Sequence, residues 1–291
     1  MSWRTIVISE CAKIDYKMNY LVIRKDNEVN RVFINEIAIL IIESTAVSMT
    51  SYLMSELIKN KVKIIFCDEK RNPESELISY YGSHDTSEKI RRQMRWNKEL
   101  KSLLWSVIVS EKIKQQMLFL KELKNDRYKL LEQYTYEIEQ GDSTNREAHA
   151  AKVYFNSLYG NEFSRVDDCN INAALNYGYS LLLSAFNREI SKNGYLTQIG
   201  IFHDNMFNHF NLSCDFMEPF RPIIDRKVYS MKLEKFDSEE KLELIDLINS
   251  KVNIDSKNHY LLNAIQIYTK SIFDALDDSD LSLIKMYKYE L

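Results

Sequence analysis

Residues 200–225 of this 291-residue chain read GIFHDNMFNHFNLSCDFMEPFRPIID, and the rest of the sequence is organised around them. Two of the chain's three prolines, Pro219 and Pro222, lie here, although proline inside a helix removes a donor and clashes with the preceding turn. Just ahead of them are His203, Asp215 and Glu218. An imidazole and two carboxylates beside a constrained backbone predict a site of fixed geometry.

These three side chains are of the types that bind divalent metals. Carboxylate oxygens suit Mg²⁺ and Mn²⁺, and imidazole adds affinity for Mn²⁺. Mg²⁺ keeps several waters and binds through one or two carboxylates plus substrate phosphate oxygens, so this set fits phosphodiester chemistry better than a closed structural site. The alternative is a solvated helix face, because Asp215 and Glu218 are three residues apart and Arg221 can pair with them.

A third ligand must come from elsewhere in the chain, and Glu147 is the best candidate. It lies in residues 144–155, TNREAHAAKVYF, where three alanines leave a predicted helix slim enough for another element to approach. The competing interpretation is structural, because Thr144 and Glu147 have the spacing of an N-terminal capping box.

The N-terminal part of the chain has the pattern of short strands. Runs rich in β-branched and aromatic residues, separated by polar breaks, predict strands at residues 3–9, 19–24, 30–34, 36–43 and 62–67. Apolar residues at helical spacing predict one helix at 49–60. We therefore expect a small β-sandwich-like domain over residues 1–82, followed by a linker at 82–85.

Beyond the linker the pattern becomes helical and remains so. Predicted helices cover residues 86–125, 128–140, 143–159, 170–193, 239–249 and 260–275. The fold class is therefore α+β, with the β-rich domain followed by a larger, all-helical domain over residues 83–291 that carries the metal site.

Composition excludes several protein classes. Apolar content of 45% and charged content of 28% are ordinary for a globular protein, and no run approaches the roughly 18 apolar residues of a membrane span. The first residues do not resemble a secretory leader. The four cysteines are far apart and form no C-x-x-C pair, which argues against disulfides or a zinc cluster. We expect a protein of the reducing cytoplasm, without a membrane contact.

Charge is distributed unevenly along the chain. The net charge of −3 does not predict a generic nucleic-acid binder, but residues 89–129 carry 12 basic and 4 acidic side chains. Such a stripe neutralises phosphates and binds DNA without sequence preference. The candidate DNA contacts in it are Lys89, Arg91, Arg92 and Arg95.

The basic stripe has an alternative interpretation, and three further arginines are candidate DNA contacts. The stripe could be a solvated helix face, with Met94 and Trp96 in the core. Arg146, Arg221 and Arg226 lie nearer the proposed site in the sequence and are candidates for holding the scissile backbone.

The motifs together resemble the CRISPR-associated integrase family, the metal-dependent subunit that inserts new spacers during adaptation. Residues 211–225 are the most specific block, because both prolines, the Phe-Arg between them and two carboxylates match at once. Glu218 as the last acidic ligand resembles the form from type II systems. Order and rough spacing match over the whole chain, and further matching blocks are REAHAAKVYF (146–155), DCNINAAL (168–175) and GIFH (200–203).

The resemblance implies a function and an assembly. Glu147, His203 and Glu218 correspond to the metal ligands, with Asp215 as a second acidic residue near the metal. The implied reaction is transesterification, in which the 3′-hydroxyl of a prespacer DNA attacks a phosphodiester at the edge of a CRISPR repeat, next to the leader. The implied partners are a second copy of the chain, joined through the N-terminal domain, and a small companion adaptation protein in a hetero-hexamer. Other adaptation proteins and the effector nuclease are further implied partners.

Two other functions use the same residues. A metal-dependent nuclease would use water as nucleophile on free or branched DNA, and sequence cannot separate attack by water from attack by a hydroxyl. A non-catalytic, architectural DNA-binding subunit would use the carboxylates only structurally.

Overall fold

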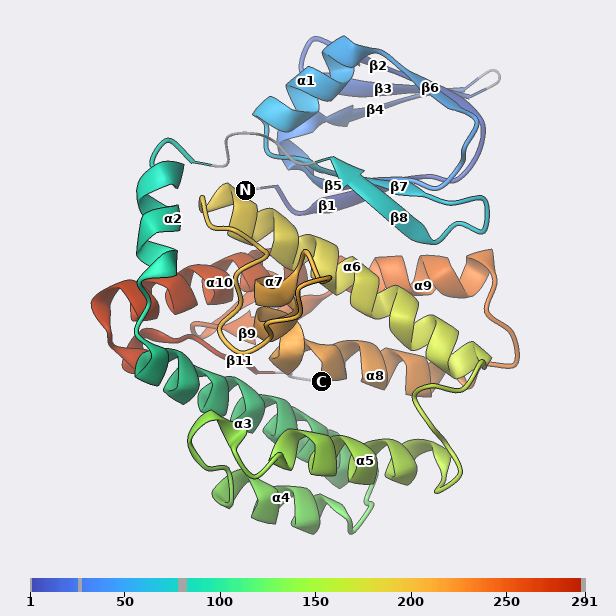
Figure 1. The fold of residues 1–291 in the computed structure, drawn as a ribbon. Helices are drawn as coiled ribbons and strands as arrows, with labels where there is room; N and C mark the ends of the chain where they lie inside the picture. Colours follow the sequence, from blue (N-terminus) through green and yellow to red (C-terminus); the bar gives the residue numbers. More distant parts are fainter. Residues whose placement is uncertain (1, 26–27, 78–82, 289–291) are drawn as a thin grey trace.

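The computed structural model describes residues 2–25, 28–77 and 83–288 (Figure 1). In the described part of the chain up to residue 77, strands form two sheets. One has the order β1-β5-β7-β8 and the other β4-β3-β2-β6. Their bounds are β1 (Arg4–Ile8), β2 (Ala12–Lys17), β3 (Tyr20–Lys25), β4 (Glu28–Phe33), β5 (Ile37–Ile42), β6 (Val47–Met49), β7 (Lys63–Cys67) and β8 (Pro73–Leu77). A 3₁₀ turn, η1 (Ile34–Glu36), precedes β5.

Both faces of β5 are covered, which explains its unbroken apolar sequence IAILII. Ile39 and Ile41 belong to the core that the helices share, whereas Leu40 and Ile42 belong to the core between the two sheets. Helix α1 (Ser51–Lys59) closes that second core with Leu53 and Leu57. A strand that is buried on both faces is apolar throughout and lacks the alternation of apolar and polar residues seen in half-exposed strands.

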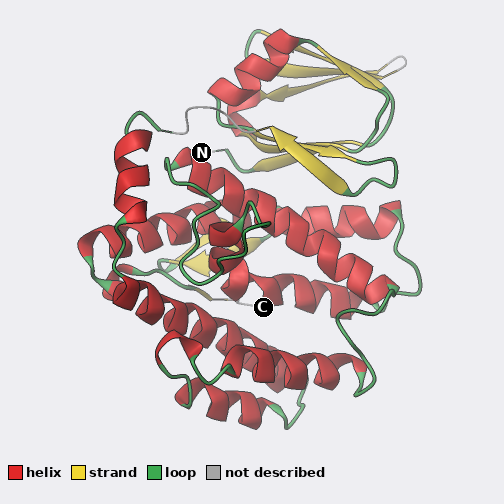
Figure 2. Ribbon diagram, in the orientation of Figure 1, coloured by secondary structure: helices red, strands yellow, loops and turns green. Residues whose placement is uncertain are grey.

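The rest of the described chain is mostly helical (Figure 2). Helix α6 runs through its centre and packs against α7, α8, α9 and α10. The bounds are α2 (Thr86–Met94), α3 (Lys98–Glu122), α4 (Tyr128–Tyr136), η2 (Gln140–Asp142), α5 (Arg146–Tyr159), α6 (Asn170–Lys192), α7 (Asn211–Met217), η3 (Glu218–Phe220), α8 (Arg221–Met231), α9 (Ser238–Ile248), α10 (Leu261–Asp278) and η4 (Leu281–Leu283).

Two sequence-based predictions for this part are wrong. It is not all-helical, because β9 (Lys251–Ile254), β10 (Lys257–Tyr260) and β11 (Tyr287–Lys288) form a small antiparallel sheet. The single helix predicted at 86–125 is two helices, α2 and α3. Asn97 lies between the two helices, and its side chain caps α3 by accepting hydrogen bonds from the backbone N–H groups of Glu99 and Leu100.

The change from strands to helices agrees with the predicted order of the α+β fold. The predicted boundary at residue 82 lies outside the described residues, and the division into domains 1–82 and 83–291 stays a prediction. The four cysteines are free thiols, as expected. Among the described helices, none is both long and apolar enough to cross a membrane.

Candidate metal centre

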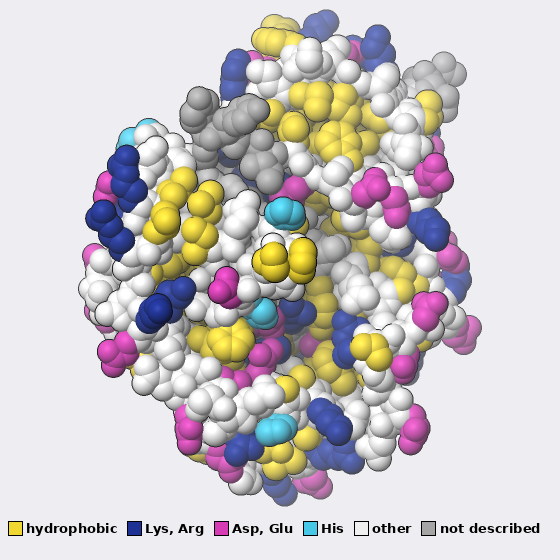
Figure 3. Space-filling model, viewed as in Figure 1, with side chains coloured by type: hydrophobic (Ala, Val, Ile, Leu, Met, Phe, Trp, Pro, Cys, Tyr) yellow, Lys and Arg dark blue, Asp and Glu magenta, His cyan; other side chains and the backbone are white. Residues whose placement is uncertain are grey.

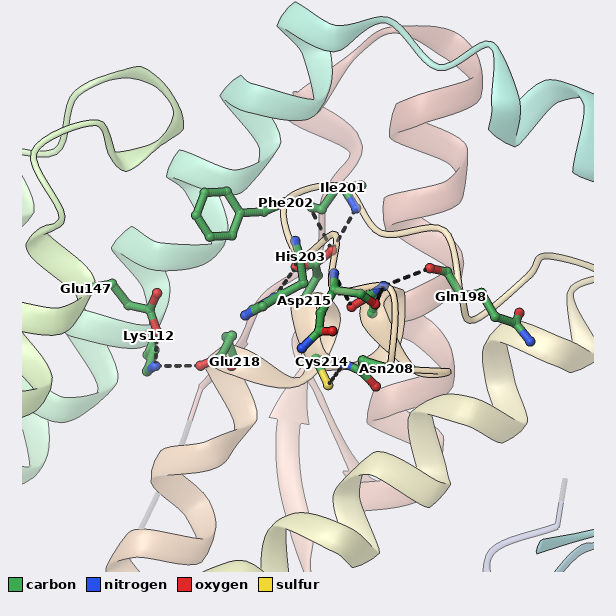
Figure 4. Close-up of polar contacts among 12 residues, drawn as sticks. Lys112, Glu147, Gln198, Ile201, Phe202, His203, Asn208, Cys214, Asp215 and Glu218 are labelled. Atoms are coloured by element: carbon green, nitrogen blue, oxygen red, sulfur yellow. Dashed lines mark hydrogen bonds and ion pairs between the residues drawn. The ribbon is translucent and has the colours of Figure 1, made fainter. Parts of the chain in front are cut away.

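Three elements bring charged side chains to one point. The Lys112 ammonium from α3 lies 2.5 Å from Glu147 Oε1, at the start of α5, and 2.5 Å from Glu218 Oε2, in η3 (Figure 4). Both α5 and η3 pack against α3, which fixes the meeting point. Glu147 and Glu218, separated by about seventy residues in the sequence, therefore converge on one cationic nitrogen.

The electrostatics of this point favour its charged form. Lys112 and Glu218 are both buried. Burial acts to lower the pKa of Lys112, but Glu218 and Glu147 outweigh it and the pKa is raised. Burial likewise acts to raise the pKa of Glu218, but Arg221 and Lys112 hold it below its ordinary value. Arg221 contributes through Nε, 2.9 Å from Glu218 Oε1. The two neighbouring cations therefore favour the ionised form of the Glu218 carboxylate.

Thr144 and Glu147 do not form the capping box that their spacing suggested. The N-cap of α5 is Asn145, in the left-handed region at φ 53°, and its side chain makes no capping bond. Asp142 takes over instead, accepting from the backbone N–H of Arg146 and Glu147 at 2.8 and 3.0 Å. The Glu147 side chain is thereby left to face α3.

His203 is held in place by Asp215. Its Nδ1 lies 2.6 Å from Asp215 Oδ1, and the backbone N–H groups of Ile201, Phe202 and His203 all donate to the same carboxylate. Asp215 is fully buried, and both of its oxygens are engaged. The hydrogen bond that His203 donates to Asp215 raises the pKa of His203 against the effect of burial, with Glu218 and Glu147 contributing. Asp215 thus orients the histidine, which leaves Nε2 as the ring nitrogen for a ligand.

Gly200 makes this arrangement possible. A Cβ at that position would lie 2.3 Å from the backbone oxygen of His203 and 2.7 Å from Asp215 Oδ2. Any larger residue would therefore push the loop off the carboxylate. The GIFH motif is explained by this close approach rather than by a special backbone angle.

Pro219 and Pro222 lie in the helical segments that carry Glu218 and Arg221. Pro219 lies at the start of η3 and Pro222 at the start of α8, positions where the missing N–H costs little. Helix α7, η3 and α8 follow one another directly. Tyr287 also donates to the Pro219 carbonyl at 2.9 Å, which anchors η3 from β11. Glu218 is therefore held on a rigid segment.

A cavity of about 590 Å³ lies beside His203, lined by α3, η2 and residues 199–204. Trp105 forms its floor, stacked on Phe202 with ring centroids 4.2 Å apart, and Phe202 is half exposed. Lys98 and Lys101 line the same cavity. Figure 3 shows histidine, acidic and basic side chains gathered in a hollow at the middle of this face.

Sequence reasoning missed Lys98, Lys101, Trp105 and Lys112. The signal was present, because intervals of three, four and seven residues place these side chains on one face of a helix. No pattern within the basic stripe singled out this face, because the face is defined by the elements that dock against α3, namely α5, η2 and η3.

The predicted DNA-binding residues fall into two groups. The first group is on α2, where Lys89 pairs with Asp85, Arg91 with Glu88 and Arg92 with Asp277, and where Arg95 is exposed. The alternative interpretation of this segment, a solvated helix face, placed Met94 and Trp96 in the core. Trp96 is buried, but Met94 is exposed.

The second group lies closer to the metal centre. Arg146 pairs with Glu137 at 3.0 Å, next to Glu147 in the chain, and Arg221 contacts Glu218. Arg226 pairs with Glu122. Only Arg221 is thus in direct contact with a predicted ligand.

Glu147, Glu218 and His203 are donors of the types that bind a divalent cation, but the Lys112 ammonium now occupies the space between the two carboxylates. Within the described residues, no three His, Cys, Asp or Glu side chains are arranged to hold a metal as they stand. The reason is visible in Figure 4, where Lys112 lies between the two carboxylates and His203 extends toward Glu218. One ammonium already contacts both carboxylates, so both are within reach of a single cation. Two carboxylates and an imidazole are the donors that Mn²⁺ and Mg²⁺ accept.

The structure thus shows an α+β protein in which two glutamates converge on one ammonium beside a histidine. A family model described as CRISPR associated protein Cas1 matches residues 5–243. A protein named CRISPR-associated endonuclease Cas1, from Neisseria meningitidis serogroup C (strain 8013), is 32% identical over 304 residues, covering 100% of both chains. The chain belongs to the Cas1 family, which confirms the resemblance found in the sequence.

Solved structures support the fold. A casposase bound to integration product has a TM-score of 0.75 at 17% identity, covering 96% of this chain and 91% of that one. A Cas6-RT-Cas1–Cas2 complex has a TM-score of 0.76 at 16% identity, covering 97% of this chain and 36% of that one. A CAS1 protein from Thermotoga maritima has a TM-score of 0.69 at 16% identity, covering 94% and 97%. At these identities the likeness concerns the fold alone.

Proposed function

We propose that the chain is a metal-dependent DNA integrase that inserts prespacer DNA into a CRISPR array. The observation that carries this proposal is the convergence of Glu147 and Glu218 on one cation position beside His203. Membership of the Cas1 family, and the named activity of the Neisseria relative, supply the substrate class. The casposase with its integration product supports joining rather than cutting as the reaction.

The residues have distinct parts in this function. Glu147, Glu218 and Nε2 of His203 would hold Mg²⁺ or Mn²⁺, which supplies Lewis-acid stabilisation of charge and eases deprotonation of the attacking hydroxyl. Asp215 keeps the proton on Nδ1 and so presents Nε2 with its lone pair. Arg221 holds Oε1 of Glu218, which keeps Oε2 directed toward Lys112.

The proposed chemistry exchanges one phosphodiester for another. The 3′-oxygen of the prespacer bonds to the phosphorus at the repeat edge as the bond to the target strand's 3′-oxygen breaks. The proton leaves the attacking hydroxyl and the departing 3′-oxygen takes one up, so no water is consumed. No protein nucleophile is needed, and the site offers carboxylates rather than an activated serine or cysteine.

The proposed assembly follows the family. The Cas1–Cas2 complexes among the structural neighbours support a small companion adaptation protein as partner. We propose a homodimer joined through residues 1–82 and a hetero-hexamer with that companion, together with contacts to other adaptation proteins and the effector nuclease. The segment from Lys232 to the end of the sequence carries 8 basic and 12 acidic side chains, which suits a protein contact better than DNA. The protein would act in the cytoplasm.

The test follows the fate of a labelled prespacer. Purified protein, its companion and a repeat-bearing plasmid are incubated with Mn²⁺, Mg²⁺ or EDTA, and the label is scored as joined or cut. Joining that needs metal, and that falls about 100-fold or more in Glu147→Gln while DNA binding persists, supports the integrase. The control is Glu137→Gln, which removes a nearby ion-paired glutamate that is outside the centre.

Each alternative function has its own outcome in that assay. Metal-dependent cutting without joining supports a hydrolytic nuclease. Full joining by Glu147→Gln shows that the ligand assignment is wrong, and DNA binding without any metal-dependent chemistry supports an architectural subunit.

A further inference from the structure

Lys112 has a place that the proposed reaction does not explain. Its side chain is 9% exposed, and its ammonium contacts Glu147 and Glu218 at 2.5 Å each. With Arg221 on the other Glu218 oxygen, the four groups in direct contact carry two negative and two positive charges. The centre is therefore neutral by itself, without any metal.

That neutrality conflicts with metal binding. A divalent ion bonded to the same two carboxylates would sit about 2.0 to 2.2 Å from their oxygens, in the region that the ammonium now fills. It would also add two positive charges to a balanced, mostly buried cluster. Lys112 must therefore move away, and the surplus charge is best offset by an anion. A DNA phosphodiester is the anion that this site is proposed to receive.

We propose that Lys112 is a resident counter-ion of the centre, which holds Glu147 and Glu218 together without metal and yields its place when metal and DNA phosphate enter together. This inference rests on the proposed metal site. It explains how the buried Glu218 and the partly exposed Glu147 can be held close together in the free protein, since the Lys112 ammonium offsets their mutual repulsion. It also makes metal binding weak in the absence of DNA.

The chain contains a matched control. Lys63 in β7 is also buried, and its Nζ lies 2.5 Å from Glu76 in β8, with side-chain exposures of 5% and 12%. This pair has one lysine for one carboxylate, and it belongs to no proposed ligand set. Replacing either lysine by methionine removes a charge and keeps a long apolar side chain.

The first measurement is thermal unfolding of Lys112→Met and Lys63→Met in EDTA and in millimolar Mn²⁺. Both variants are expected to melt below the parent protein in EDTA. Mn²⁺ should restore Lys112→Met, because the metal replaces the missing cation and binds only the folded state, but should not restore Lys63→Met. Lys112→Arg keeps the charge and should respond to Mn²⁺ as the parent does.

The second measurement counts free Mn²⁺ by electron paramagnetic resonance, with and without a short DNA duplex. Without DNA, Lys112→Met should bind Mn²⁺ about tenfold more tightly than the parent, equivalent to about 1.4 kcal/mol. DNA should tighten Mn²⁺ binding in the parent about tenfold and in Lys112→Met clearly less.

The outcomes separate this inference from the proposed function. If neither the parent nor the variant binds Mn²⁺, with or without DNA, the proposed metal site fails and the lysine role fails with it. If both bind with the same affinity, or if DNA tightens both equally, the metal site stands and the counter-ion role is overturned. A Lys112→Met protein that stays unfolded even in Mn²⁺ also overturns it.

Discussion

Two buried lysines in this molecule differ in the number of carboxylates that they serve. Lys63 joins two strands of one sheet through Glu76, whereas Lys112 joins α3, α5 and η3 through Glu147 and Glu218. Burial lowers the pKa of Lys63 because one carboxylate does not offset the loss of water. Two carboxylates do offset it at Lys112, whose pKa is raised.

The difference separates an isolated ion pair from the proposed metal centre. A one-to-one pair has no capacity for a further cation. One lysine between two carboxylates holds a geometry that a divalent ion can also use. Excess carboxylate around a buried lysine is therefore the feature that distinguishes the centre from an ordinary buried pair.

The largest expected effect compares the glutamates of the two clusters. Glu218→Gln should lower metal-dependent strand transfer about 1,000-fold, or about 4 kcal/mol, because the amide cannot serve as an anionic ligand. Glu76→Gln should keep the rate within about threefold at temperatures where it is folded, although it loses stability through the unpaired Lys63. Single-turnover strand-transfer rates and melting curves measure both. Equal losses of activity would remove the distinction between the clusters.

An intermediate effect is expected at Asp215, which acts through His203. Asp215→Asn should lower the maximal rate about 10- to 100-fold, because the imidazole loses the partner that orients it. Asp246→Asn, at an exposed position on α9, is the control.

The pH dependence of the same variant tests the cause. Protonated His203 cannot bind metal, so activity should fall as pH drops through its pKa, which Asp215 raises above the ordinary value. In Asp215→Asn that pKa falls, so the acidic limb of the pH–rate profile should move to lower pH. Nuclear magnetic resonance titration of His203 in EDTA gives the pKa directly. An unchanged pKa would contradict the orienting role.

The smallest effect concerns single cations of the two candidate DNA-binding surfaces. Lys101→Ala, in the cavity beside His203, should weaken DNA binding about two- to tenfold and reduce the dependence of log K on log salt by about one. Arg91→Ala on α2 should have a smaller effect if DNA follows the cavity. Fluorescence anisotropy over a range of salt measures both. A larger loss for Arg91→Ala would place the DNA path on α2, as the sequence suggested.

Much of the fold was predictable because its patterns are local. The unbroken apolar run of β5 and the helical periodicity of α6 and α10 are strong local signals. The β9–β10 hairpin was missed because its turn, Asp255-Ser256, has positive φ at both positions without the Asn-Gly or Asp-Gly sequence that usually announces it. β11 is only two residues long and pairs with a distant strand, which no local pattern reveals.

The site was predictable in part for a different reason. Glu147, His203 and Glu218 lie in distinctive motifs, so their convergence could be proposed before it was observed. Lys112 lies in no motif, and its role depends on where α5 and η3 dock against α3. Asp215 was expected near the metal, whereas its oxygens are engaged by His203 and by three backbone N–H groups. Such second-layer contacts are tertiary and leave no local sequence signal.

The double burial of β5 has a consequence for how the molecule unfolds. Its side chains Ile39 and Ile41 complete the helical core, so the helices cannot be separated from the first sheet without exposing that strand to water. Heat should therefore melt both parts in one cooperative transition. A truncated chain that begins after the strands would expose the same apolar surface and aggregate, whereas co-expression of the two segments could rebuild the protein. The proposed metal centre thus depends for its stability on a strand that supplies none of its candidate ligands.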